Sequence, residues 1–237
     1  MQSTTATLHE NPMDRMAVAS IAGIEMLSGT ADRRSSIRKL SKHEMLFSEG
    51  DKGGRYYEVL EGVVCGFRIL HDGRRQILSF SYPGDIIGIG HENNCKCSCE
   101  AVSPAALRSI PSPTAQRSVE AQLEMTRKLL NVATMELAGM HDHFVMVGRK
   151  SSMEKIASFL LDLAWRKAGK DATSVTFQLP MTRTDIADFL GLTIETVSRR
   201  LTTLRKLGVI DLPQITTVHV TDMARLEELA EIDDESW

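Results

Sequence analysis

The sequence predicts an α+β protein with an N-terminal β-barrel, one long helix and a C-terminal winged helix-turn-helix. Three observations support this. Short apolar runs separated by glycine and aspartate turns fill residues 37–110, a pattern typical of an all-β unit. Residues 119–147 contain no proline, as an unbroken helix requires. Residues 181–208 then show helical apolar spacing on both sides of a glycine.

The chain of 237 residues divides accordingly. We expect a mobile N-terminal tail over residues 1–24, a sensory β-barrel over 25–118, a long helix over 119–148 and the helix-turn-helix domain over 149–237. No run approaches the ~18 apolar residues of a membrane span, and the N-terminus lacks the apolar core of a signal peptide. We therefore expect a cytoplasmic protein without a membrane partner, in which cysteines stay reduced.

Within the barrel region, the clearest turn is His71-Asp72-Gly73. An Asp-Gly pair tolerates the positive φ angles of a tight hairpin turn. Further turns at Glu61-Gly62 and at Pro83-Gly84-Asp85 leave apolar runs of strand length between them. Strands at this spacing indicate a sandwich or a barrel.

The predicted long helix carries an apolar seam whose members step by three and four residues, as in a heptad repeat. A helix packed on its own core would show a similar stripe. The length of the helix favours a homodimer, and since no charge interrupts the seam, we expect dimerisation without a ligand. The seam residues are Leu130, Ala133, Leu137, Met140, Phe144 and Val147. His141 and His143 flank it and are expected to be solvated.

A second amphipathic helix is predicted over Met153–Arg166, followed by a loop over Gly169–Thr173. The first helix of the helix-turn-helix begins after Thr182, a good N-cap, with Asp185 at the capping-box position. Gly191 supplies a position that tolerates positive φ at the bend.

The second helix of the pair is capped by Thr193 and ends at Gly208. Its residues Glu195, Ser198 and Arg199 stand at i, i+3 and i+4 and share one face. An acceptor, a hydroxyl and a bidentate donor on an exposed helix can read base edges in a major groove. By periodicity alone, an ordinary helical hairpin is an equal alternative.

After this pair, Val209–Leu212 and Thr217–Val220 bracket Pro213-Gln214 and indicate a β-hairpin, the wing of a winged helix. Met223–Ala230 is expected to form a short acidic helix. The chain has a net charge of −3, but residues 193–208 hold four basic and one acidic side chain. A local basic face is compatible with DNA, although non-specific binding should be weak and fall quickly with salt.

The run T-R-x-D-I-A-D-F-L-G-L-T-x-E-T-V-S-R-x-L resembles the DNA-binding signature of the cyclic-AMP receptor protein and fumarate-and-nitrate-reduction regulator (CRP/FNR) family. Its E-T-V-S-R segment is the form found in the FNR and FixK-like branches. The resemblance implies a dimeric regulator that reads a TTGAT…ATCAA-like palindrome in double-stranded DNA and contacts RNA polymerase. It also implies oxygen- or redox-linked gene control. The DNA contacts implied are Thr182, Arg183, Thr193, Glu195, Thr196, Ser198, Arg199, Arg200 and Arg205.

The run E-G-V-V-C-G-F-R-I-L-H-D-G-R-R-Q-I-L-S-F-S-Y-P-G-D-I-I-G is similar to the cyclic-nucleotide-binding-like barrel of the same family. In nucleotide-binding members, a Glu after the G-D-x-x-G turn binds ribose and an Arg-Ser pair binds phosphate. Here Ile89 replaces the Glu, and residues 94–99 lack the Arg. Because a buried phosphate needs that counter-charge, we do not expect cyclic AMP.

The four cysteines leave several possibilities open. Residues 1–64 contain no cysteine, so the arrangement of the iron–sulfur members is absent. Cys65 and the run Cys95, Cys97 and Cys99 could be structural, a thiol redox sensor, or ligands of a metal or iron–sulfur cluster. Alternate residues on a strand share one face but do not converge on one metal. A disulfide between Cys65 and one of the three would tie two barrel strands together.

Two further classes of function receive little support. The sequence shows no nucleophile elbow, phosphate-binding glycine loop or metalloprotease helix, so we do not expect an enzyme or a resident cofactor. A ligand-binding module without a DNA role is the remote alternative, because such a module has no need of the E-T-V-S-R face.

Overall fold

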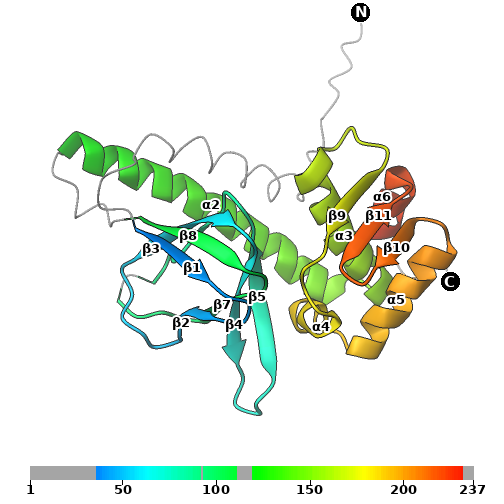
Figure 1. Ribbon diagram of the computed structural model, residues 1–237, viewed down its shortest axis with the longest axis horizontal. Coiled ribbons are helices and arrows are strands. Elements are labelled where there is room, and N and C mark those ends of the chain that lie inside the picture. The colour runs from blue at the N-terminus through cyan, green and yellow to red at the C-terminus, as the bar shows by residue number, and fades with distance from the viewer. Residues whose placement is uncertain (1–35, 92, 111–118, 232–237) are drawn as a thin grey trace, which may run out of the picture.

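The computed structural model describes residues 36–91, 93–110 and 119–231 (Figure 1). The expected tail over residues 1–24 and the boundary at residue 118 lie outside these ranges. The described chain forms a β-barrel, a long helix α2 that runs along the barrel, and a C-terminal unit that lies beside the barrel at the far end of α2. None of the described helices is long and apolar enough to cross a membrane.

Within the described residues, the barrel consists of two four-stranded antiparallel sheets. Strands β4 and β5 meet at the predicted turn, where Gly73 has φ 84°. The barrel core contains Val59, Val64 and Leu107, each with 0% exposure. In sheet order, the strands are β1 (Ile37–Leu40), β8 (Ala105–Ile110), β3 (Tyr56–Glu61) and β6 (Ile86–Ile87), then β2 (Met45–Phe47), β7 (Ser98–Ala101), β4 (Val64–Ile69) and β5 (Arg75–Ser81).

Helix α2 spans Val119–Arg149, one residue longer than predicted. Its Met125 and Leu129 are buried against Tyr56, Ile86 and Ile110 of the barrel. One face of α2 therefore packs against the barrel of the same chain, and the seam lies on another face.

The C-terminal unit confirms the predicted helix-turn-helix and adds a strand that we did not predict, β9. Helix α3 begins at a Ser151–Glu154 capping box. β9 pairs with β11 and places Phe177 opposite Val218, so the wing sheet has the order β10-β11-β9. The elements are α3 (Ser152–Ala168), β9 (Val175–Gln178), α4 (Arg183–Leu190), α5 (Ile194–Lys206), β10 (Ile210–Gln214), β11 (Thr217–Val220) and α6 (Met223–Glu231).

The wing departs from the prediction in one respect. Strand β10 continues through Pro213 to Gln214, so the hairpin turn falls on Ile215 and Thr216. Pro213 lies in the stretch between Asp211 and Gln214 where the strand register shifts. A proline can occupy such an irregularity because its missing N–H breaks no regular ladder bond there.

The barrel and the C-terminal unit share a core. The rings of Phe80 from β5 and Phe189 from α4 lie 5.1 Å apart, and Phe159 from α3 lies within 6.2 Å of both. The outer face of β5 thus packs directly against the first helix of the helix-turn-helix.

Candidate nucleic-acid interface

The start of α4 is fixed by the predicted capping box. The Thr182 hydroxyl accepts a hydrogen bond from the Asp185 backbone N–H at 3.1 Å, and the Asp185 carboxylate accepts one from the Thr182 N–H at 2.9 Å. Gly191 ends the helix in the left-handed conformation at φ 63°. The capping box and Gly191 together set the angle at which α5 follows α4.

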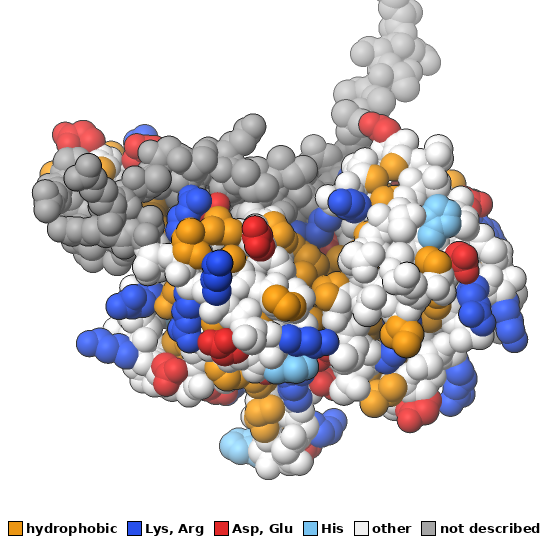
Figure 2. Space-filling view, in the orientation of Figure 1, with side chains coloured by type: hydrophobic (Ala, Val, Ile, Leu, Met, Phe, Trp, Pro, Cys, Tyr) orange, Lys and Arg blue, Asp and Glu red, His pale blue; other side chains and the backbone are white. Residues whose placement is uncertain are grey.

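Helix α5 presents the predicted reading face to solvent. Thr193 caps the helix by accepting from the Thr196 N–H, and Val197, Leu201 and Leu204 are buried on the inner side. Glu195, Ser198 and Arg199 are exposed on the outer side. Figure 2 shows Lys and Arg side chains over α5 at the right-hand edge of the molecule.

Electrostatics at the N-terminus of α5 keep Glu195 ionised. A backbone N–H and the Thr193 hydroxyl donate hydrogen bonds that lower the pKa of the Glu195 carboxyl, with a smaller contribution from Arg199. An ionised carboxylate is an acceptor only, which suits the N4 amino group of cytosine.

The remaining predicted DNA contacts divide by exposure. Thr182 and Arg205 are exposed, whereas Arg183 is half-buried, and burial lowers the pKa of its guanidinium. The Arg200 Nε donates to the Ser152 hydroxyl at 2.8 Å, so this side chain ties the recognition helix to the start of α3. Its placement adds a positioning role that the sequence did not reveal.

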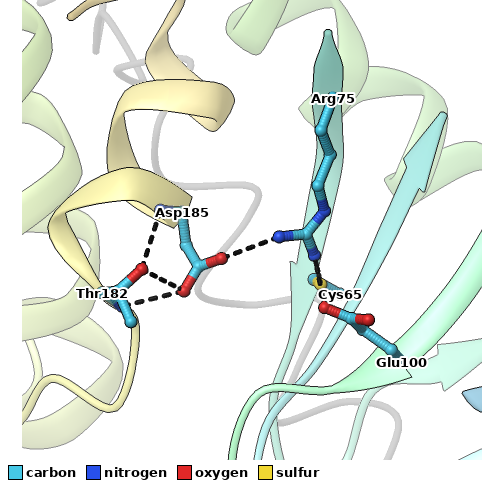
Figure 3. A network of polar contacts seen from close by, with 5 residues as sticks. All are labelled: Cys65, Arg75, Glu100, Thr182 and Asp185. Carbon is cyan, nitrogen blue, oxygen red and sulfur yellow. Dashed lines mark hydrogen bonds and ion pairs between the residues drawn. The ribbon is translucent and has the colours of Figure 1, made fainter. Parts of the chain in front are cut away.

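A cluster around Arg75 of β5, shown in Figure 3, holds α4 against the barrel. Its Nη1 lies 2.9 Å from the Asp185 carboxylate, and its Nη2 lies 2.6 Å from that of Glu100. The guanidinium also lies 4.4 Å from the ring centre of Phe67. Asp185 therefore serves two purposes, because it caps α4 and pairs with the barrel. Sequence analysis missed this pair, since its partners are 110 residues apart and follow no periodic pattern.

A second bond reinforces this junction. The Gln76 side-chain amide donates to the backbone carbonyl of Asp188 at 2.6 Å. Adjacent β5 residues thus hold both the start and the middle of α4, which fixes the orientation of the reading helix relative to the barrel.

The four thiols lie on different sides of the sheet. Cys65 pairs in register with Glu100 and points to the outer face, where its sulfur accepts from Arg75 Nη2 at 3.2 Å. Cys99 is in register with Gly66, one residue further along β4, and so points to the inner face. Cys97 lies on that inner side too, 3.7 Å from where a Gly66 side chain would begin. The register therefore contradicts a disulfide from Cys65 to Cys97 or Cys99.

The thiols are also poorly suited to act as nucleophiles or as metal ligands. Burial raises the pKa of Cys65 to about 12 and that of Cys97 to about 11, and it raises the pKa of Cys95 and Cys99 as well. A protonated thiol is a weak nucleophile and a poor ligand. Across the described ranges, no three Cys, His, Asp or Glu side chains are arranged to hold a metal ion, so the cysteines do not fit a cluster in this conformation.

We therefore expect reduced and peroxide-treated protein to bind DNA with affinities within about twofold of each other. The check is a titration of labelled duplex at one fixed salt concentration. Cys97→Ser is the matched variant because Cys97 is the least buried of the four thiols. A loss of affinity that reductant reverses, and that Cys97→Ser removes, would contradict the expectation.

The predicted seam on α2 is largely uncovered. Leu137 is 53% exposed, Met140 62% and Phe144 79%. Leu130 is also exposed, whereas Ala133 and Val147 are half-buried. An exposed apolar stripe of this length is typical of a surface that contacts another protein.

Comparison with known proteins agrees with the two halves of the fold. A family model described as a cyclic nucleotide-binding domain matches residues 37–121, and one described as a Crp-like helix-turn-helix domain matches residues 154–229. The chain is 40% identical over 190 residues to the nitrogen fixation regulation protein FixK of Bradyrhizobium diazoefficiens, covering 80% of both chains. It is 30% identical over 223 residues to the transcriptional activator protein FnrL of Cereibacter sphaeroides, covering 92% of this chain and 90% of that protein.

Among solved structures, FixK2 from Bradyrhizobium japonicum superposes with a TM-score of 0.75 at 31% identity, covering 84% of this chain and 98% of that one. The barrel, the long helix and the exposed reading face together define a winged helix-turn-helix DNA-binding regulator. The chain belongs to the CRP/FNR family of transcription regulators, with FixK proteins among its relatives.

Proposed function

We propose that this regulator acts as a cytoplasmic homodimer that binds a TTGAT…ATCAA-like palindrome and controls genes in response to oxygen limitation or redox state. The observation that carries the proposal is the exposed face of Glu195, Ser198 and Arg199 on α5. Arg199 can pair with guanine O6 and N7, and Glu195 can accept from cytosine N4.

The seam on α2 supports the dimer. A palindrome presents the same half-site twice, and a two-fold axis through paired helices presents the same reading helix twice. The apolar residues exposed on α2 supply the surface that such pairing buries.

The names of the relatives support the proposed response to oxygen limitation. Several are nitrogen fixation regulation proteins, and two are called anaerobic regulatory proteins. Surface loops of the barrel are the part left free to contact RNA polymerase when α5 lies in the groove. A cyclic nucleotide is not part of the proposal, because Ile89 stands where the resemblance implies a ribose-binding Glu in nucleotide-binding members. Ile89 is half-buried against the contact between the barrel and α2.

A selection of bound sequences from random duplexes tests the proposal. We expect an inverted repeat whose half-sites are centred about one helical turn apart, roughly 34 Å. Recovery of a single half-site, or of no consensus, would contradict the palindrome. Adding cyclic AMP should leave the selected sequences and the affinity unchanged.

A further inference from the structure

The C-terminal unit is joined to α2 by only two residues, Lys150 and Ser151, between the end of α2 and the start of α3. Ser151 caps α3. The Lys150 ammonium donates to the Ser158 hydroxyl at 2.8 Å and to the Ala230 carbonyl at 2.7 Å. Both side chains of the link are therefore bonded to the C-terminal unit itself. The link fixes where this unit begins, but it does not fix how the unit is rotated relative to the barrel.

The apolar contact between the two units does not fix that rotation by itself. Phe80, Phe159 and Phe189 pack through tilted rings. Burial of apolar surface is non-directional, so it stays favourable over a range of small rotations. Charge-assisted hydrogen bonds depend on distance and angle. The polar bridges between the two units therefore decide their relative orientation.

Two arginine bridges connect the units, and they have opposite polarity. In the first, the barrel supplies the cation, because Arg75 of β5 lies 2.9 Å from the carboxylate of Asp185 on α4 (Figure 3). In the second, the C-terminal unit supplies the cation, because Arg166 of α3 lies 3.5 Å from the carboxylate of Asp85 between β5 and β6. The arginine side chains are only 23% and 14% exposed, so salt screens these pairs less than surface pairs.

Each arginine is also held by its own unit. Arg75 lies 2.6 Å from the carboxylate of Glu100 on β7. Arg166 lies 3.2 Å from the carboxylate of Asp162, one helical turn earlier on α3. A side chain that is already held loses little conformational freedom when it pairs across the junction. The two bridges therefore join rigid points on the two units.

The opposite polarity of the bridges favours a single arrangement. A shift that carried one unit along the other would bring Arg75 towards Arg166. The acids Asp85 and Asp185 would likewise lie on opposing surfaces without a cation between them. Like charges placed against each other suppress wrong pairings and fix the register of an interface.

The orientation of the C-terminal unit has a direct consequence for DNA. Helix α5 follows α4 through the capped turn at Gly191, so it moves with the bridged helix. In a two-fold dimer, this orientation sets the separation of the two α5 helices. One helical turn of DNA is about 34–36 Å and about ten base pairs, so each added base pair moves a half-site by roughly 3.4 Å and about a tenth of a turn. A fixed orientation therefore accepts one spacing, whereas a loosely held unit accepts several.

We propose that Arg75 and Arg166 are positioning residues that select the spacing between the two half-sites, although neither touches DNA. Arg199 and its neighbours on α5 read the sequence of a half-site, and the two bridges determine how far apart two half-sites lie. The choice of spacing rests on the proposed dimer and palindrome. The fixed orientation of the C-terminal unit does not.

The first test measures spacing preference. Duplexes carry the selected half-sites at the preferred spacing or with one base pair added or removed. In Arg75→Gln, the carboxylates of Glu100 and Asp185 face each other across the junction without their cation. We expect the preference of the wild-type protein for its own spacing to fall by about fivefold or more in this variant and in Arg166→Gln. The base preference within each half-site should stay unchanged.

Two further variants separate positioning from stability. Arg75→Lys keeps the charge but cannot hold two carboxylates with a planar fork, so its spacing preference should lie between those of wild type and Arg75→Gln. Arg108→Gln is the matched control, because Arg108 is 30% exposed and pairs with Glu58 at 3.3 Å entirely within the barrel. It should keep the spacing preference. An unchanged preference in Arg75→Gln, or an equal loss in Arg108→Gln, would overturn the proposal.

The second test measures the orientation without DNA. Spin labels replace the exposed Lys39 of β1 and the exposed Thr202 of α5 in a Cys97→Ser background, since the other three thiols are buried. Labelled chains are diluted with unlabelled protein so that distances within one chain dominate. We expect one narrow distance distribution, which Arg75→Gln broadens or shifts and Arg108→Gln does not.

The two tests distinguish the failure of this inference from the failure of the proposed function. A distance distribution that Arg75→Gln leaves narrow and unshifted would refute the positioning role, whatever the protein does with DNA. A broadened distribution in a protein that selects no inverted repeat would refute the palindrome, and with it the choice of spacing, while supporting the fixed orientation.

Discussion

Replacing Leu137 by glutamate, or Met140 by aspartate, is expected to leave the protein monomeric and to remove most of its DNA affinity. Both side chains are more than half exposed on α2 and belong to the seam. In a two-fold pair of helices, each new carboxylate would be buried without a partner, and it would occur twice. A buried charge without a counter-charge costs about 3–5 kcal/mol, enough to dissociate an ordinary dimer.

Sedimentation analysis at micromolar concentration measures the effect, and a duplex titration measures its consequence for DNA binding. Asn131→Asp is the control, since Asn131 is exposed on the same helix but lies off the seam. It should remain a dimer. The interface assignment fails if wild-type protein already sediments as a monomer, or if the Leu137→Glu variant stays dimeric.

Replacing Arg199 by alanine should relax the preference at one base pair of each half-site. The side chain is exposed on the outer face of α5, one helical turn after Glu195. A bidentate arginine–guanine contact discriminates by about 1–3 kcal/mol against the wrong base. The loss should fall on the specific site and leave non-specific affinity almost unchanged.

Arg205→Ala is the matched comparison, because it removes the same charge from the last turn of the same helix. If Arg205 meets a phosphate, its loss should weaken all sequences alike and reduce the salt dependence by about one unit of slope. Site selection with both variants separates the two roles. An Arg199→Ala protein that selects the wild-type consensus would show that the reading face lies elsewhere.

The contacts of β5 with α4 around Arg75 also influence the DNA affinity that both predictions measure. Asp185 caps α4 and pairs with β5 at the same time, and Gln76 holds the carbonyl of Asp188. The orientation of α5 is therefore set by the barrel as well as by the turn at Gly191. A substitution in this cluster would change DNA affinity without touching DNA.

The helix-turn-helix could be predicted from signals between residues that are close in the sequence. The capping box of Thr182 and Asp185, the left-handed Gly191 and the apolar stripe of α5 depend on residues at most a few positions apart. Such signals act within one helical turn, so periodicity and cap residues predict them. The exposed seam on α2 followed in the same way from its steps of three and four.

Only the tertiary structure decided what joins the halves. The pair Arg75–Asp185 brings together residues from separate elements, as does the stack of His143 on Phe189, although His143 was expected to be solvated. Strand β9 is short, with Phe177 as its one buried side chain, and it exists because β11 offers it a partner. The register of β4 with β7 put Cys65 and Cys99 on opposite faces of the sheet. These outcomes depend on contacts between distant segments, and no local spacing encodes which distant side chain will meet which.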